Sequence, residues 1–275
     1  MLSRKLSTTR LKGERKGRRR GTSTDFADYR NYVSGDDLRH LDWKIYARLE
    51  KLFLKLFLEE ENLHVHVLLD TSASMAYGEP EKLHYARRLA AAIGYITLCR
   101  MDLLTIRSFG EKLRDGFGPK RGKANAAACF DFLGKLEATQ RTALAPALRT
   151  FAFGTRSRGL VVILSDFYDP EGYEQALRFL FGRNLEVFVI HLLSPEELRP
   201  TLQGDLRLVD AELGDSTDIS VGKTLLDVYQ RSLNTFTDGL RQFVIARGGT
   251  YLLTPTDTPF ERLVLDVFAR RGLVQ

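Results

Sequence analysis

One carboxylate and two hydroxyls follow a short apolar run at intervals of two residues. Asp70, Ser72 and Ser74 come directly after Leu68 and Leu69. Carboxylate and hydroxyl oxygens without cysteine ligands suit a hard cation such as Mg²⁺ or Mn²⁺ better than zinc. These side chains therefore predict a site for Mg²⁺ or Mn²⁺.

The elements around this cluster place it where α/β proteins bind ligands. Residues 64–69 have the β-branched and apolar composition of a buried strand, and the polar side chains begin where that strand ends. In open α/β sheets, ligands bind outside the carboxyl ends of the strands. An alternative interpretation is that Asp70, Ser72 and Ser74 only cap the next helix, which is a common role for these residue types.

The Asp-x-Ser-x-Ser pattern resembles the metal-ion-dependent adhesion site of von Willebrand factor type A domains. The resemblance implies two further ligands from distant loops, for which Thr142 and Asp166 are the candidates. The chain departs from that pattern because Gln140-Arg141 stands where the family has Gly-Gly, so Thr139 is an alternative to Thr142. Asp169 is a weaker alternative to Asp166.

A second motif lies nearer the N-terminus and is more specific. It resembles the signature of the domain of unknown function 58 family, in which such a block precedes a von Willebrand type A core. The matching residues are Arg30, Tyr32, Gly35, Asp36, Asp37, Arg39, Leu41, Asp42, Trp43, Ala47 and Arg48. The resemblance covers about residues 20–275 and identifies a family better than it identifies an activity.

Strand and helix patterns alternate after residue 50. Strands are expected at 64–69, 102–109, 160–164, 185–193 and 249–254, and helices at 81–101, 124–136, 144–153, 171–181, 224–247 and 260–271, with a polar two-stranded insert at 204–221. This alternation predicts an α/β fold, a doubly wound, mostly parallel sheet with helices on both faces. The family resemblance makes it von Willebrand factor type A-like.

The sequence predicts three parts. Residues 1–21 form a basic, mobile tail, residues 22–62 a signature block packed on the core, and residues 63–275 the α/β domain. Within the block, residues 38–49 have helical spacing and residues 52–58 are expected at an edge of the main sheet. Trp43 is expected to anchor the block through burial of its ring. The charged residues Asp36, Asp37, Arg39, Asp42 and Arg48 suit either a salt-bridge lattice or a partner-facing surface.

Composition and charge limit the class of protein. The net charge is +6, but residues 1–20 hold nine Lys or Arg against Glu14, which is +8 and leaves −2 for the rest. A specific nucleic-acid-binding domain is therefore not expected, because its basic residues would lie on the folded part. No apolar run reaches the ~20 residues that span a bilayer. Cys99 and Cys129 suit buried free thiols, and we expect a cytoplasmic protein.

Motifs of common enzymes are missing from the sequence. There is no dinucleotide-binding, P-loop or nucleophile-elbow motif. We expect a non-enzymatic protein-binding module whose metal ion binds an Asp or Glu of a partner. By resemblance to its family, the chain is expected to act as an adaptor or co-chaperone together with a MoxR-type AAA+ ATPase. The alternative is a Mg²⁺-dependent phosphoryl-transfer enzyme with Asp70 as acceptor, although Ser72 stands where such an enzyme has a second Asp.

Overall fold

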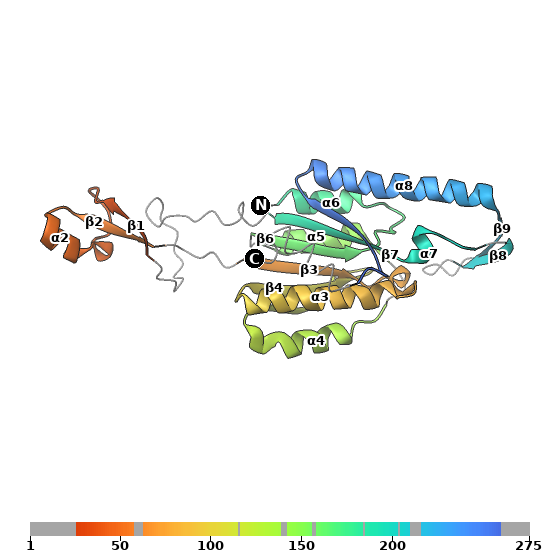
Figure 1. The fold of residues 1–275 in the computed structure, drawn as a ribbon, viewed down its shortest axis with the longest axis horizontal. Helices are drawn as coiled ribbons and strands as arrows, with labels where there is room; N and C mark the ends of the chain where they lie inside the picture. The colour runs from red at the N-terminus through yellow and green to blue at the C-terminus, as the bar shows by residue number, and fades with distance from the viewer. Residues whose placement is uncertain are drawn as a thin grey trace. The chain divides into compact units, whose positions relative to one another are not determined.

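The computed structural model describes residues 26–57, 63–114, 116–138, 142–155, 158–183, 185–202, 204–209 and 216–259 (Figure 1). The chain divides into two compact units, Met1–Asn62 and Leu63–Gln275, and each is described by itself. The predicted basic tail at 1–21 and the predicted last helix at 260–271 lie outside the described residues.

The second unit is built on a six-stranded sheet in the order β10-β7-β6-β3-β4-β5. All pairs are parallel except β4 with β5, which is antiparallel. The strands are β3 (His64–Asp70), β4 (Leu103–Phe109), β5 (Phe117–Lys120), β6 (Gly159–Ser165), β7 (Leu185–Leu193) and β10 (Thr250–Pro255). The chain leaves β3 toward β4 and later returns to its other side as β6. The carboxyl ends of β3 and β6 therefore lie at a switch point of the sheet.

Helices cover both faces of this sheet (Figure 1). The helices α3 (Lys82–Cys99) and α4 (Ala126–Gly134) pack on one face, and α5 (Leu144–Gly154), α6 (Glu174–Phe181) and α8 (Lys223–Ala246) pack on the other. Short helical turns are η2 (Ala73–Ala76), η3 (Lys123–Asn125) and α7 (Pro195–Leu198). The predicted α/β fold with a mostly parallel sheet is confirmed. Within the described part of the chain, no helix is long and apolar enough to cross a membrane.

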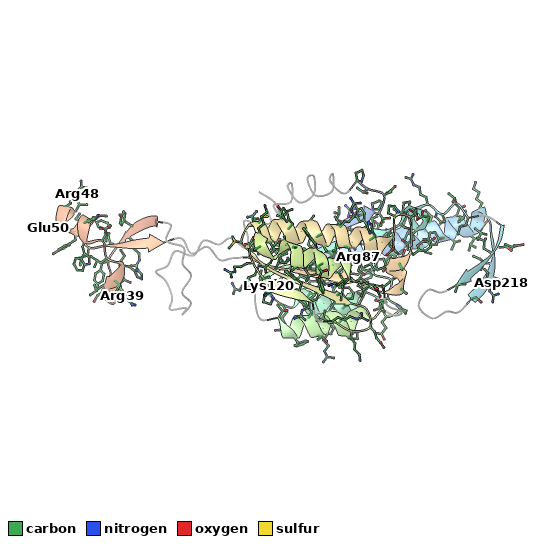
Figure 2. All side chains as sticks on the ribbon, turned by 90° about the horizontal axis from the view of Figure 1, so that it is seen from below. Arg39, Arg48, Glu50, Arg87, Lys120 and Asp218 are labelled. Carbon is green, nitrogen blue, oxygen red and sulfur yellow. The ribbon has the colours of Figure 1, made fainter. Side chains whose placement is uncertain are left out.

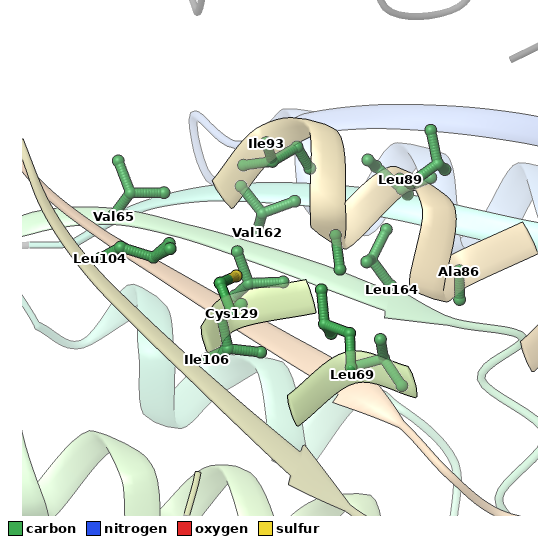
Figure 3. Close-up of a cluster of buried hydrophobic side chains, with 14 of the residues drawn as sticks. Val65, Leu69, Ala86, Leu89, Ile93, Leu104, Ile106, Cys129, Val162 and Leu164 are labelled. Atoms are coloured by element: carbon green, nitrogen blue, oxygen red, sulfur yellow. The ribbon is translucent and has the colours of Figure 1, made fainter. Parts of the chain in front are cut away.

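The apolar composition of the central strands follows from burial on both faces. Val65, Val67 and Leu69 point into the core under α3 and α4, whereas Leu68 points into the core under α5 and α6. Figure 3 shows the first of these cores, in which Leu69 lies among side chains of α3 and of the neighbouring strands. A strand buried on both faces is apolar at successive positions instead of alternating. This double burial fixes β3 and thereby the position of Asp70 at its end.

The two cysteines are both free, but only one matches the expected burial. Cys129 lies in the core under α3 and α4, whereas Cys99 at the end of α3 is exposed. The prediction of two buried thiols is wrong for Cys99, because this residue ends the helix on its outer side.

The polar insert forms the predicted pair of strands, β8 (Gly204–Val209) and β9 (Ser216–Val221), which are antiparallel. The long helix α8 follows, and only its second half packs deeply on the sheet. Leu233 and Leu240 are buried, whereas Leu225 and Tyr229 near its beginning are exposed. The prediction that one continuous apolar face of this helix is core is therefore wrong for its first turns.

The first unit has its own two-stranded antiparallel sheet, β1 (Phe26–Asn31) with β2 (Phe53–Phe57). The prediction that residues 52–58 join the main sheet is wrong, because β2 pairs with β1. The expected helix at 38–49 is split into η1 (Leu38–His40) and α2 (Trp43–Leu49). The split occurs because the Asp42 side chain accepts hydrogen bonds from the backbone N–H groups of Lys44 and Ile45, which caps a new helix.

The signature residues of this unit make local contacts. Asp36 forms a two-pronged salt bridge with Arg30 at 2.7 and 2.9 Å, and Asp42 accepts a hydrogen bond from the Tyr29 hydroxyl at 3.1 Å. Asp37 pairs with Arg39 at 2.6 Å, so ion pairs support the salt-bridge lattice for Asp36, Asp37 and Arg39. The printed contacts of Asp42 are hydrogen bonds instead. Trp43 is 62% exposed and so is not buried within its own unit. Its packing on the core of the second unit stays a prediction. Arg39 and Arg48 are exposed on the same unit (Figure 2).

Candidate metal site

Asp70 ends β3 and is held by hydrogen bonds from two directions. Its Oδ1 accepts from the backbone N–H of Ser72 at 2.9 Å, and its Oδ2 accepts from the Ser165 hydroxyl, which ends β6, at 2.5 Å. The side chain is only 1% exposed. Ser165 also accepts a hydrogen bond from Phe167 N–H at 2.9 Å. The carboxylate is therefore fixed between the ends of two adjacent strands.

Ser72 and Ser74 place their hydroxyls side by side. The two Oγ atoms are 3.0 Å apart, with Ser72 buried and Ser74 half-buried. Ser72 precedes the turn η2, but its side chain makes no capping hydrogen bond, and the first residue before α3 is Glu81, which makes none either. The helix-cap alternative is therefore wrong for this cluster. The two hydroxyls bond each other, and the Ser72 side chain also bonds Asp70.

Asp166 follows β6 directly and is 1% exposed. Burial, and then the negative charge of Asp166, raise the pKa of Asp70 to about 7. Two interacting buried carboxylates are stabilised when a cation lies near both. The structure joins Asp70, Ser72 and Ser74 by hydrogen bonds. Asp166 is near enough for its charge to act on Asp70.

Thr142 lies in the loop before α5. The next residue, Ala143, donates its N–H to the Gly110 carbonyl after β4 at 3.0 Å, and Leu144 N–H donates to Asp169 at 2.6 Å. These bonds place the loop at the edge of the sheet where β4 and β6 end. The position of the Thr142 hydroxyl relative to the two serines stays a prediction, and its alternative, Thr139, lies outside the described residues.

Asp169, the alternative to Asp166, has a different role. Its Oδ2 accepts from Leu144 N–H and its Oδ1 accepts from Glu171 N–H at 2.8 Å. Both oxygens are therefore used to join the loop after β6 to the start of α5. Asp166 stays the better candidate ligand, because it follows β6 directly and its charge acts on Asp70.

A buried lysine beside the site was not predicted from the sequence. Lys82, the first residue of α3, is 0% exposed, and its ammonium lies 2.8 Å from Asp166 Oδ2 and 2.5 Å from Glu197 Oε1. Burial lowers the pKa of Lys82, but the two carboxylates outweigh this and hold the pKa above its usual value. Burial raises the pKa of Glu197 against the effect of Lys82. The short contacts favour the charged pair at neutral pH.

The sequence contained little to reveal Lys82, Glu197 or Ser165. Lys82 stands in the run Glu79-Pro80-Glu81-Lys82, which has the composition of an exposed turn. Glu197 lies more than a hundred residues away, and no local pattern relates the two. Ser165 next to Asp166 was a detectable signal, because it is a polar residue at the end of an all-apolar strand.

The donor set fits a hard divalent cation. Buried carboxylates and paired hydroxyls are oxygen ligands of the kind that Mg²⁺ and Mn²⁺ prefer. Among the described residues, no group of three or more His, Cys, Asp or Glu side chains gathers to hold a metal. A metal here would therefore depend on the hydroxyls of Ser72, Ser74 and Thr142 as well as on the two aspartates.

A mostly parallel sheet with helices on both faces defines an α/β protein, and oxygen side chains gather at the ends of its strands β3 and β6. The chain belongs to the family described as "Protein of unknown function DUF58", whose model matches residues 28–234. The expected family is thus confirmed. The family description names no activity.

Known proteins resemble the chain over most of its length. The uncharacterized protein Mb1516 of Mycobacterium bovis is 27% identical over 257 residues, which cover 90% of this chain and 79% of that protein. The crystal structure of the conserved hypothetical protein BatB from Bacteroides thetaiotaomicron matches with a TM-score of 0.50 and 16% identity, over 76% of this chain and 98% of that chain. A von Willebrand factor type A structure from Catenulispora acidiphila matches with a TM-score of 0.40 and 21% identity, over 66% of this chain and 43% of that chain. The likeness to BatB concerns the fold.

Proposed function

We propose that this chain is a non-enzymatic protein-binding module that holds Mg²⁺ or Mn²⁺ at Asp70, Ser72, Ser74, Thr142 and Asp166. The observation that carries the proposal is the pair of serine hydroxyls 3.0 Å apart, next to the buried Asp70 at the end of β3. Capping does not explain these hydroxyls, since Ser72 makes no capping bond. In this proposal the oxygens lie together because they are ligands of one divalent cation.

The proposed ligands also favour a partner of defined chemistry. Three of the five are neutral hydroxyls, so the proposed ligands bring only two negative charges to the ion. Mg²⁺ takes six oxygens in octahedral geometry, which allows a carboxylate from another protein to complete its coordination. We therefore propose a partner that supplies an Asp or Glu. That a MoxR-type AAA+ ATPase is this partner, or acts with it, rests on the family resemblance alone.

The structure gives little support to the alternative, in which Asp70 accepts a phosphoryl group. A nucleophilic carboxylate needs an oxygen that can reach its substrate. Asp70 is 1% exposed, and both of its oxygens accept hydrogen bonds, one from Ser72 N–H and one from Ser165. These bonds fit an orienting role beside a metal better than attack on phosphorus.

Metal binding is tested first on the whole chain. We expect Mg²⁺ or Mn²⁺ to raise the melting temperature, because a ligand that binds the folded state stabilises it by mass action. Replacing both serines (Ser72→Ala with Ser74→Ala) should remove this shift and the heat of Mn²⁺ binding in calorimetry. The matched control is Thr97→Val, which removes a buried hydroxyl that bonds Ile93 at 2.7 Å within α3. Equal Mn²⁺ binding by the serine variant would contradict the site.

Partner recognition is tested with the same variants. Purified chain on beads should retain a partner from a lysate in the presence of Mg²⁺, and retention should be lost with a chelator or with the double serine variant. Retention that survives both changes would show that binding does not use the metal. Replacement of the acidic residues of a recovered partner then identifies the carboxylate.

A further inference from the structure

Lys82 is the one lysine whose ammonium lies in the interior beside the candidate metal site in the part of the chain that the structure describes. The rings of Tyr168 and Tyr77 lie 5.2 and 5.9 Å from its Nζ, and the carboxylates of Asp166 and Glu197 lie at 2.8 and 2.5 Å. This environment excludes water on several sides. The ammonium therefore depends on protein groups for its stabilisation.

The neighbouring backbone builds this position. Gly78 has a φ of +100°, and a Cβ there would lie 2.4 Å from the Ser194 Cβ, so the loop before α3 packs tightly against the end of β7. Ser194 forms a capping box with Glu197, whose Oε2 accepts from Ser194 N–H at 2.7 Å. The Tyr229 hydroxyl of α8 donates to the Glu197 carbonyl at 2.8 Å. Glu197 is thus held in place to receive Lys82 with its other oxygen.

Packing alone gives no reason for a lysine here. Burial of a charge pair carries a desolvation penalty, and apolar residues of similar size often serve stability as well or better. A methionine could fill the same space. The contact that distinguishes Lys82 is its bond to Asp166, which is also a predicted metal ligand.

The bond between Lys82 and Asp166 changes the total formal charge of the site. The buried carboxylates of Asp70 and Asp166 and the half-buried carboxylate of Glu197 carry −3 when ionised, and Lys82 carries +1. The total of −2 equals the charge that one divalent cation neutralises. Without Lys82 the same groups would carry −3.

We infer that Lys82 is an internal counter-charge of the metal site, held by Glu197, which positions Asp166 and lowers the negative charge of the site to match one divalent cation. This inference rests on the proposed metal site. It assigns Lys82 and Glu197 to the regulation of metal affinity and explains why two charged groups from distant parts of the chain are buried together.

The test is a charge series in the full chain. Relative to the wild-type charge of −2, Glu197→Gln gives −1, and the double variant Lys82→Met with Glu197→Gln restores −2. We expect Glu197→Gln to weaken Mn²⁺ binding at least tenfold, because one unit of charge near a divalent ion outweighs the 1.4 kcal/mol of a tenfold change. The double variant should bind within about threefold of wild type. Free Mn²⁺ is measured by electron paramagnetic resonance during titration.

Controls separate this inference from the proposed function. Glu196→Gln changes an exposed carboxylate on the same short helix and should leave Mn²⁺ binding unchanged. Two outcomes would overturn the role of Lys82 and leave the metal site standing. In the first, Glu197→Gln binds Mn²⁺ as tightly as wild type. In the second, the double variant binds Mn²⁺ as weakly as Glu197→Gln. Absence of Mn²⁺ binding by wild type would overturn both. The single variant Lys82→Met is left out of the series, because it removes the cation from Asp166 and Glu197 and is expected to fold poorly.

Discussion

Asp70 shows at the scale of one residue how the fold holds the carboxylate that we propose as a metal ligand. The side chain accepts hydrogen bonds from Ser72 N–H and from Ser165, and its burial raises its pKa to about 7. The first bond orients the turn that carries the two serines, and the second joins the ends of β3 and β6. A residue that is costly to bury is thus positioned by two strands of the sheet at once.

The bond from Ser165 gives a prediction about stability. Ser165→Ala removes the donor to Asp70 and the acceptor of Phe167 N–H, which leaves buried polar groups unsatisfied. We expect a loss of about 1–3 kcal/mol in the free energy of unfolding, measured by urea denaturation. The control Thr97→Val, which removes a single hydroxyl bond inside α3, should lose less. Equal losses in the two variants would show that Ser165 does not hold Asp70 as described.

Helix α8 shows at the scale of an element how one periodic sequence can serve two environments. Its apolar residues repeat along the whole helix, but Leu233 and Leu240 are buried while Leu225 is 41% exposed. The helix begins beyond the sheet, next to the pair β8 and β9, and packs on β10 only later (Figure 1). Periodicity predicted the helix and its apolar side, but it contains no information about where the neighbouring sheet ends.

This division of α8 predicts unequal effects of the same substitution. Leu240→Ala should lower the free energy of unfolding by about 2–5 kcal/mol, because it opens a cavity in a closely packed core. Leu225→Ala should change it by less than about 1 kcal/mol, because that side chain lies at the surface. The free energy of unfolding of each variant is measured by chemical denaturation. The two variants are matched, because each replaces Leu by Ala in the same helix. Similar losses at the two positions would mean that the first half of α8 is also packed.

At the scale of the whole molecule, sequence patterns predicted the elements of the second unit better than those of the first unit. All strands and helices expected between 63 and 255 are present, since each has a long periodic or wholly apolar pattern. Two short elements, β5 and α7, were missed because a few residues have no clear period. The pairing of β2 with β1 was also missed, because strand pairing depends on contacts between segments and not on either segment alone.

The site was predictable to the extent that its residues follow strands. Asp70 and Asp166 end two apolar strands, and parallel strands of one sheet bring such ends together. The buried Lys82 and Glu197 were not predictable, because each stands in a charged local sequence of the kind that usually faces solvent. Their burial arises from tertiary packing of the loop at Gly78 against Ser194.

The core under α5 gives the molecule a pH dependence that originates away from the metal site. Burial lowers the pKa of His66 from its ordinary 6.5 to about 3, and the ring stacks on His64 at 3.8 Å between centroids. The unfolded chain therefore binds a proton that the folded chain does not between these two pH values. Stability is fully present above about pH 6.5 and falls as the pH drops toward 3.

Replacement of His66 tests this dependence. In wild type, His66 should account for about 2 kcal/mol of the stability lost between pH 6.5 and 4.5, at 1.36 kcal/mol for each pH unit over which only the unfolded chain is protonated. His66→Gln cannot titrate, so its denaturation midpoint should vary less with pH over this range, even if the variant is less stable at pH 7. The control is His84→Gln, which changes an exposed histidine of α3 and should follow the wild-type pH profile. If His66→Gln instead kept the wild-type slope, the proton uptake on unfolding would have to come from other groups, and His66 would not be the buried neutral ring that the core packing describes.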